Sequence, residues 1–193
     1  MAPRRITTAC TRQGAEVRSL RDRSLRRALQ VKPGVVRSFA MPSDVQRHQI
    51  AEHLRYEIAM LWACGTEIRR GGYPWAASNS LVESFALHAR NVVDFFFTEP
   101  VGDDVVARHF FRDETAWAGI RTAIPATLAT AKKRANKEVS HLTYSRLAVS
   151  PNDKPWPVEE IVREVDTVLR IFCERADLLP DGVKLLRYKE LLP

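Results

Sequence analysis

Apolar residues recur at steps of three and four along most of the chain after residue 43, which is the spacing that gives an α-helix one buried face. Four stretches show it most clearly. Their apolar positions are Ile50, Leu54, Ile58, Leu61 and Ile68; Leu81, Phe85, Ala89, Val92 and Phe96; Leu128, Ala131, Ala135, Val139 and Leu142; and Val158, Ile161, Val165, Val168 and Phe172. No stretch of useful length alternates with period two. The pattern predicts an all-α fold, a four-to-five-helix bundle.

Short local signals predict where these helices begin and end. The sequences "SDVQ" (43–46) and "SLVE" (80–83) read as capping boxes, in which a serine hydroxyl and the side chain three residues later satisfy free backbone N–H groups. They predict the starts of the first two helices. Gly71-Gly72 predicts the end of the first helix, because glycine accepts positive φ. Pro125 is expected as the first residue of the third.

The segments between and after the main helices are less regular. Residues 103–111 predict a shorter helical segment, followed by an irregular stretch around Trp117. Residues 150–157, "SPNDKPWP", form a proline-rich connector to the last helix. The C-terminal residues 178–193 are apolar enough to pack back onto the bundle or onto a second copy of the chain.

The formal net charge of +7 is unevenly distributed. Residues 1–40 hold ten Lys and Arg against two Asp and Glu, whereas residues 41–193 hold twenty against twenty-one. We therefore expect a basic, disordered N-terminal arm (1–40) and a nearly neutral helical domain (41–193). This balance excludes a uniformly basic nucleic-acid-binding domain.

Three interpretations of the arm are open. It is a basic tail that contacts nucleic acid or acidic surfaces, an organellar transit peptide, or upstream sequence that is not normally translated. We favour the third, with Met41 as the start, because every organised signal begins just after Met41.

The residue composition indicates the cellular compartment and limits which metal or cofactor sites are expected. The three cysteines are far apart in the sequence, which favours a reducing, cytoplasmic setting, and Cys64 and Cys173 lie within apolar helical patterns. The longest apolar runs, such as 92–97, are far shorter than the ~20 residues of a membrane span, so no membrane segment is expected. His48 and His53 are five residues apart and so face opposite sides of a helix, whereas shared metal ligands favour a spacing of four, so we expect no metal site. No glycine-rich phosphate loop is present, and we expect no cofactor.

One arginine and one histidine are spaced so that both are expected on the same face of a helix. Arg134 and His141 are separated by six residues, and seven steps of 100° on a helix place them within about 20° of each other. The similar pair Arg47 and His53 comes out about 120° apart, on different faces. Arg134 and His141 are expected at the border of the apolar stripe, with Tyr144 three residues further on the same side.

This spacing resembles the HEPN superfamily, helical bundles whose hallmark is an arginine followed after four to six residues by a histidine. A second likeness is to a group of uncharacterised bacterial proteins with a "HARN…FFF" helix and an "N…HLTY.R" helix. These read here "LHARNVVDFFF" (87–97) and "NKEVSHLTYSR" (136–146), and the likeness covers residues 43–177. Many catalytic HEPN proteins have a small polar residue directly after the arginine. Here Ala135 stands there and Asn136 follows.

The resemblance implies a metal-independent endoribonuclease of the toxin or defence type, with the site commonly built across a homodimer and RNA as substrate. Arg134 would stabilise charge on the phosphate and His141 would accept the 2′-hydroxyl proton, with Tyr144 and Asn136 assisting. The alternative is a non-catalytic helical binding module that contacts a protein or nucleotide partner. In that case His141 hydrogen-bonds a neighbouring helix and Arg134 pairs with Glu138, four residues on.

A second polar patch is expected on the second helix, formed by His88 at the margin of the apolar face, Asn91 just beyond it and Arg90 on the polar side. In the structural interpretation, His88 lies at the edge of the core with its hydrogen-bonding groups satisfied. Asn91 then forms an interhelical hydrogen bond, and Arg90 forms a surface ion pair with Asp94. The functional interpretation is a second polar contact surface.

Overall fold

The computed structural model describes residues 42–141, 143–151 and 154–180. The predictions made for the arm (1–40), for most of the C-terminal segment (181–193) and for Leu142 concern residues outside these ranges. The described chain is helical and contains no strand, so the all-α prediction is confirmed.

Four longer helices form the bundle. They are α2 (Asp44–Arg70), α3 (Trp75–Phe97), α5 (Ala126–Arg134) and α6 (Val158–Arg175). Shorter elements join them: the 3₁₀ turn η1 (Ala107–Phe110), the one-turn helix α4 (Ala116–Ile120), the π-helical turn η2 (Ala135–Val139) and the 3₁₀ turn η3 (Tyr144–Ala148).

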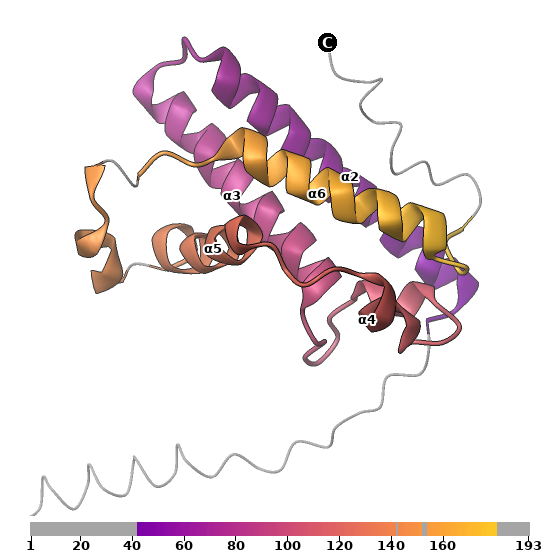
Figure 1. The fold of residues 1–193 in the computed structure, drawn as a ribbon. Coiled ribbons are helices and arrows are strands. Elements are labelled where there is room, and N and C mark those ends of the chain that lie inside the picture. Colours follow the sequence, from indigo (N-terminus) through magenta and orange to yellow (C-terminus); the bar gives the residue numbers. More distant parts are fainter. Residues whose placement is uncertain (1–41, 142, 152–153, 181–193) are drawn as a thin grey trace, which may run out of the picture. The chain divides into compact units, whose positions relative to one another are not determined.

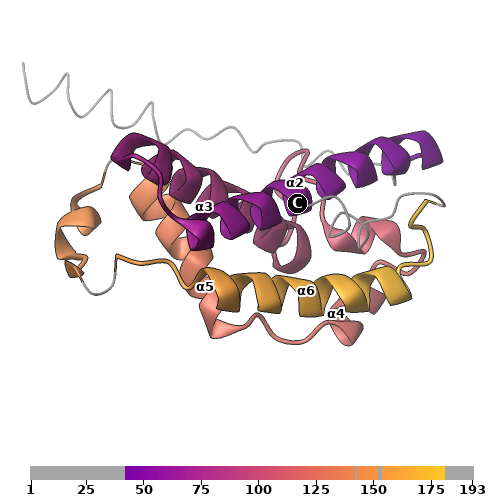
Figure 2. The same ribbon diagram turned by 90° about the horizontal axis from the view of Figure 1, so that it is seen from above.

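The helices α2 and α3 form an antiparallel hairpin, and α6 lies along it (Figure 1). Helix α3 is central, since it packs against α2, α5, α6 and η1. Seen from above, α6 covers one side of the hairpin, and α5 lies beside the start of α6 (Figure 2). This arrangement explains why α3 buries residues on more than one flank.

Six aromatic side chains fill the end of the bundle near α4. The ring of Phe172 lies with its centroid 5.5–6.1 Å from five others. These five are Phe95, Phe96, Phe110, Phe111 and Trp117. The indole N–H of Trp117 donates a 2.8 Å hydrogen bond to the carbonyl of Phe96. Burial of this indole explains why the stretch predicted to be irregular contains the helical turn α4.

The predicted helix ends are partly right. Ser43 caps α2 as a complete capping box with Gln46, and the chain leaves α2 at Gly71, where φ is +65°. The second capping box is wrong. α3 begins at Trp75, five residues before Ser80, and the Ser80 hydroxyl donates back to the carbonyl of Ala76 at 2.9 Å. A serine inside a helix can bond the preceding turn in this way, so the motif did not mark a start.

Two other predicted elements differ slightly from those in the structure. Pro125 precedes the first residue of α5 by one position. The segment 103–111 forms only the short η1 turn. The apolar stripes themselves are confirmed: most of their members are buried or packed against the buried core.

Candidate functional site

The chain segment that carries the arginine–histidine motif is not one continuous α-helix. α5 ends at Arg134 and widens into η2, where the N–H of Ser140 bonds the carbonyl of Ala135 at 2.9 Å, five residues back. The chain then leaves the helix, and His141 lies at an exposed bend before η3. The prediction that one helix carries Arg134, His141 and Tyr144 is therefore wrong, and the 100° step that placed Arg134 beside His141 does not apply beyond α5.

Arg134 is held by its own neighbours. Its Nε and Nη2 groups donate to both carboxylate oxygens of Glu138 at 2.9–3.1 Å. Nη2 also donates to the carbonyl of Lys154 at 2.9 Å and Nη1 to that of Pro155 at 3.2 Å. The guanidinium lies over the ring of Trp156, 4.4 Å from its centroid. The predicted pair with Glu138 is confirmed, and the side chain is 15% exposed.

The remaining motif residues lie apart from this cluster. His141 is exposed, Tyr144 is 92% exposed and Asn136 is half-buried. Among the residues the structure describes, no hydrogen bond or ring contact joins Arg134 to His141. The structure thus brings Arg134 together with Glu138 and Trp156, and leaves the imidazole and the phenol facing solvent.

A groove of about 290 Å³ lies between α5 and the start of α6, and Arg134 and Trp156 line one end of it. Across the groove the Thr127 hydroxyl donates to Glu160 at 2.5 Å, tying the two helices together. Of the two charged residues that line the groove, Arg134 is paired with Glu138 and Glu160 accepts the hydrogen bond from Thr127.

Positive charge gathers around η2 and η3. Residues 132–154 contain six Lys and Arg against two Asp and Glu, although the domain from residue 41 has a balance of −1. Four of these cations are exposed, and within the described ranges none of the four forms an ion pair. They are Lys133, Lys137, Arg146 and Lys154.

The segment that carries these cations is folded onto the end of α5. The Thr143 hydroxyl donates to the carbonyl of Lys137 at 2.8 Å, and Arg146 donates to the carbonyl of Val139 at 3.4 Å. The exposed side chains of Tyr144 and Leu147 lie in the same segment. We call this region the basic end and define it as Lys133, Lys137, His141, Tyr144, Arg146 and Lys154.

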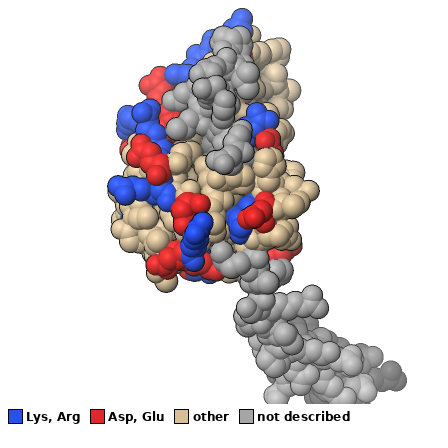
Figure 3. All heavy atoms as spheres, turned by 90° about the vertical axis from the view of Figure 1, so that its right-hand side faces the viewer, with Lys and Arg blue, Asp and Glu red and all other residues tan. Residues whose placement is uncertain are grey.

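The opposite end of the bundle has a different charge pattern. Figure 3 shows this face, the right-hand side of Figure 1, with Lys and Arg interspersed among Asp and Glu. The near-neutral charge of the domain is therefore an average over a mixed surface and one locally basic segment. Sequence counts over the whole domain concealed this difference.

The second polar patch is an interhelical tie. Nδ1 of His88 lies 2.8 Å from Oε2 of Glu57, and the Asn91 amide donates to the same oxygen at 3.0 Å. His88 is 8% exposed, and Tyr56 packs edge-on against it at 5.8 Å. The predicted interhelical hydrogen bond from Asn91 is confirmed, as is the surface pair of Arg90 with Asp94 at 3.5 Å.

Glu57 is the residue that sequence reasoning missed at this patch. Burial raises the pKa of its carboxyl, but the hydrogen bonds from His88 and Asn91, with the positive charge of His88, lower that pKa more, so the net shift is downward. The available signal was weak, because Glu57 directly precedes Ile58 of the apolar stripe of α2 just as Glu67 directly precedes Ile68. Glu57 is half-buried, and a carboxylate that is partly removed from water is stabilised by hydrogen-bond partners, of which the "HARN" sequence supplies two.

Over the described ranges, no three His, Cys, Asp or Glu side chains gather as a metal-binding group. No helix in that part of the chain is both long and apolar enough to cross a membrane. Comparison of the chain with family models, curated proteins and solved structures finds no match. The HEPN resemblance therefore rests on the motif residues alone.

Proposed function

We propose that the protein is a helical RNA-binding module that contacts RNA through the basic end. The observation that carries this proposal is the set of four exposed cations without ion-pair partners in the described chain, which lie in the segments before and after a 92% exposed Tyr144. Lysine and arginine neutralise phosphates, and an exposed aromatic ring offers a surface on which a base can stack.

The environment of Arg134 favours binding over cleavage. An arginine that stabilises charge on a reacting phosphate must offer free N–H groups to it. The guanidinium of Arg134 already donates to Glu138 and to two backbone carbonyls. We therefore assign Arg134 a structural role that positions the basic end.

The metal-independent endoribonuclease implied by the HEPN resemblance is the second candidate. One observation favours it: the exposed imidazole of His141 lies three residues from the exposed phenol of Tyr144, so a general base would be accessible to RNA. In this case a second copy of the chain, as in a homodimer, would have to supply the cation at the phosphate.

The binding proposal is tested by fluorescence anisotropy with a labelled single-stranded RNA across a salt series. The variant Lys133→Gln/Lys137→Gln/Lys154→Gln is compared with Arg70→Gln/Arg170→Gln/Arg175→Gln, which removes three exposed cations elsewhere. Both variants keep the arm, so its contribution is common to them. Each lost contact to single-stranded RNA lowers the salt slope by about 0.7, so the first variant should lose about 2 units. Equal losses in both variants would contradict the proposal.

Cleavage is tested on the same RNA in excess EDTA. A binding module leaves the RNA intact. Cleavage by the wild type that disappears in His141→Ala but persists in His48→Ala, an exposed histidine on α2, would support the endoribonuclease instead. Cleavage that survives His141→Ala would point to a contaminating nuclease and remove the enzyme hypothesis.

A further inference from the structure

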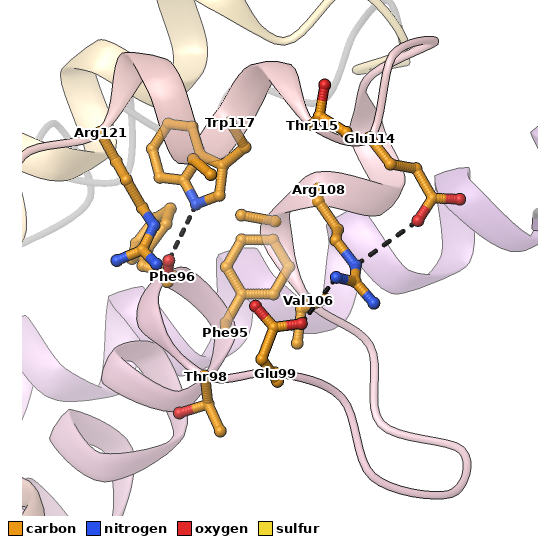
Figure 4. Close-up of a pocket in the computed structure, with 12 residues that line it drawn as sticks. Phe95, Phe96, Thr98, Glu99, Val106, Arg108, Glu114, Thr115, Trp117 and Arg121 are labelled. Atoms are coloured by element: carbon orange, nitrogen blue, oxygen red, sulfur yellow. Dashed lines mark hydrogen bonds and ion pairs between the residues drawn. The ribbon is translucent and has the colours of Figure 1, made fainter.

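A cavity of about 310 Å³ opens where the end of α3 meets η1 and α4 (Figure 4). Its apolar lining includes Phe95, Phe96, Trp117 and Ala118. Its volume is at the lower end of the range for small-molecule sites, and an apolar wall with a few convergent polar groups is typical of them. None of the residues of the basic end lines it.

One side of the cavity carries a net negative charge. Arg108 donates to Glu99 at 2.7 Å and lies 3.5 Å from Glu114, so two carboxylates face one guanidinium. The Nε group of Arg108 is buried and has no hydrogen-bond partner in the described part of the protein. Two carboxylates and one guanidinium sum to a charge of −1.

The other side carries a positive charge. Arg121 lies over the ring of Phe97, 5.4 Å from its centroid, and has no carboxylate partner within the described ranges. Figure 4 shows the guanidinium groups of Arg121 and Arg108 reaching down opposite sides of the cavity. Lys132 donates a hydrogen bond to Thr98 and forms an ion pair with Asp94 at 2.5 Å. These two charges cancel, so the cavity keeps one negative side and one positive side.

We propose that this cavity binds a small zwitterion with an apolar side chain, such as a free apolar amino acid or a short peptide. The ligand carboxylate pairs with Arg121, its ammonium group with Glu99 and Glu114, and its side chain packs on Phe95 and Trp117. A simple anion would meet the two carboxylates, and a simple cation would meet Arg121. A ligand with both charges satisfies both sides, and the proposal does not depend on RNA binding.

The test uses the full chain and matched probes measured by isothermal titration calorimetry. L-phenylalanine and L-alanyl-L-phenylalanine carry both charges. N-acetyl-L-phenylalanine lacks the ammonium group, and L-phenylalaninamide lacks the carboxylate. We expect one of the zwitterions to bind with a Kd of about 1 mM or lower, and each singly charged phenylalanine derivative to bind about tenfold more weakly than the better zwitterion. The proposal is overturned if neither zwitterion saturates below about 10 mM, or if a singly charged derivative binds equally well.

Three variants locate the binding. Arg121→Met keeps an aliphatic stem over Phe97 but removes the charge, so it should weaken both zwitterions about tenfold and leave L-phenylalaninamide unchanged. Ala118→Trp fills the cavity from an exposed position of α4 and should abolish all binding. Arg170→Met, an exposed change on α6, should have no effect. Unchanged zwitterion affinity in Arg121→Met would overturn the assignment even if Ala118→Trp fails to fold.

Discussion

The role of Arg134 can be measured by replacing it and following the free energy of unfolding. Arg134→Gln removes three hydrogen bonds to Glu138, two to backbone carbonyls and the contact with Trp156. Breaking a fully buried ion pair costs about 3–5 kcal/mol, but these side chains are 15% and 21% exposed, which lowers the cost. Loss of the cation–π contact adds about 0.5–1 kcal/mol. We expect Arg134→Gln to destabilise the protein by about 3 kcal/mol.

Urea denaturation of the full chain measures this change, with the m-value as a check that the two states are unaltered. Arg134→Lys keeps the charge but loses the planar fork, so it should lose roughly half as much, about 1.5 kcal/mol. Arg146→Gln is the control, because Arg146 is exposed and makes one long hydrogen bond among the described residues; it should change stability by less than about 0.5 kcal/mol.

RNA affinity separates a structural from a functional arginine. If Arg134 is structural, folded Arg134→Gln should bind RNA within about threefold of the wild type, because four of its five N–H groups are already donated within the fold and the exposed cations of the basic end remain. A stability loss below about 1 kcal/mol combined with a tenfold or greater loss of RNA binding or cleavage would refute the reasoning.

Three further predictions concern the bundle. The pKa of Glu57 is lowered from its usual 4.5, so its contribution to stability is present above pH 4.5 and is lost as the pH falls through the lower pKa of the folded state. In Glu57→Gln, the free energy of unfolding measured in urea should therefore depend less on pH in this acid range. Gly65→Ala brings a Cβ within 3.2–3.3 Å of buried side chains and should destabilise the protein by about 1–2 kcal/mol. Gly119→Ala meets nothing within 4 Å and should stabilise the protein by about 0.5–1 kcal/mol. A higher melting temperature for Gly65→Ala than for Gly119→Ala would contradict this prediction. Phe172→Ala should cost about 3–5 kcal/mol in denaturant titrations, because the ring is fully buried among five others.

The long helices could be predicted because their signals are local and repeated. The stripe of α6 and the capping box of α2 each report on a few neighbouring residues, and both are confirmed. The Arg134–Glu138 pair was predictable for the same reason, since four residues span one helical turn.

The end of α5 could not be predicted because its cause lies elsewhere in the chain. No glycine or proline occurs between residues 126 and 150, so no local breaker marks η2. The hydrogen bonds that hold Arg134 there reach carbonyls 20 and 21 residues later. Similarly, the partner of His88 lies 31 residues away on α2, and only tertiary packing brings it close.

The hydrogen bonds of Arg134 also close a ring in the chain. One side chain joins the last turn of α5 to the backbone just before α6, so the ends of the intervening stretch are pinned together within the folded domain. The conformational entropy of bringing those ends together is lost once, during folding. A guanidinium first singled out as a reactive group therefore acts as a cross-link between two parts of the chain that are 20 residues apart in the sequence.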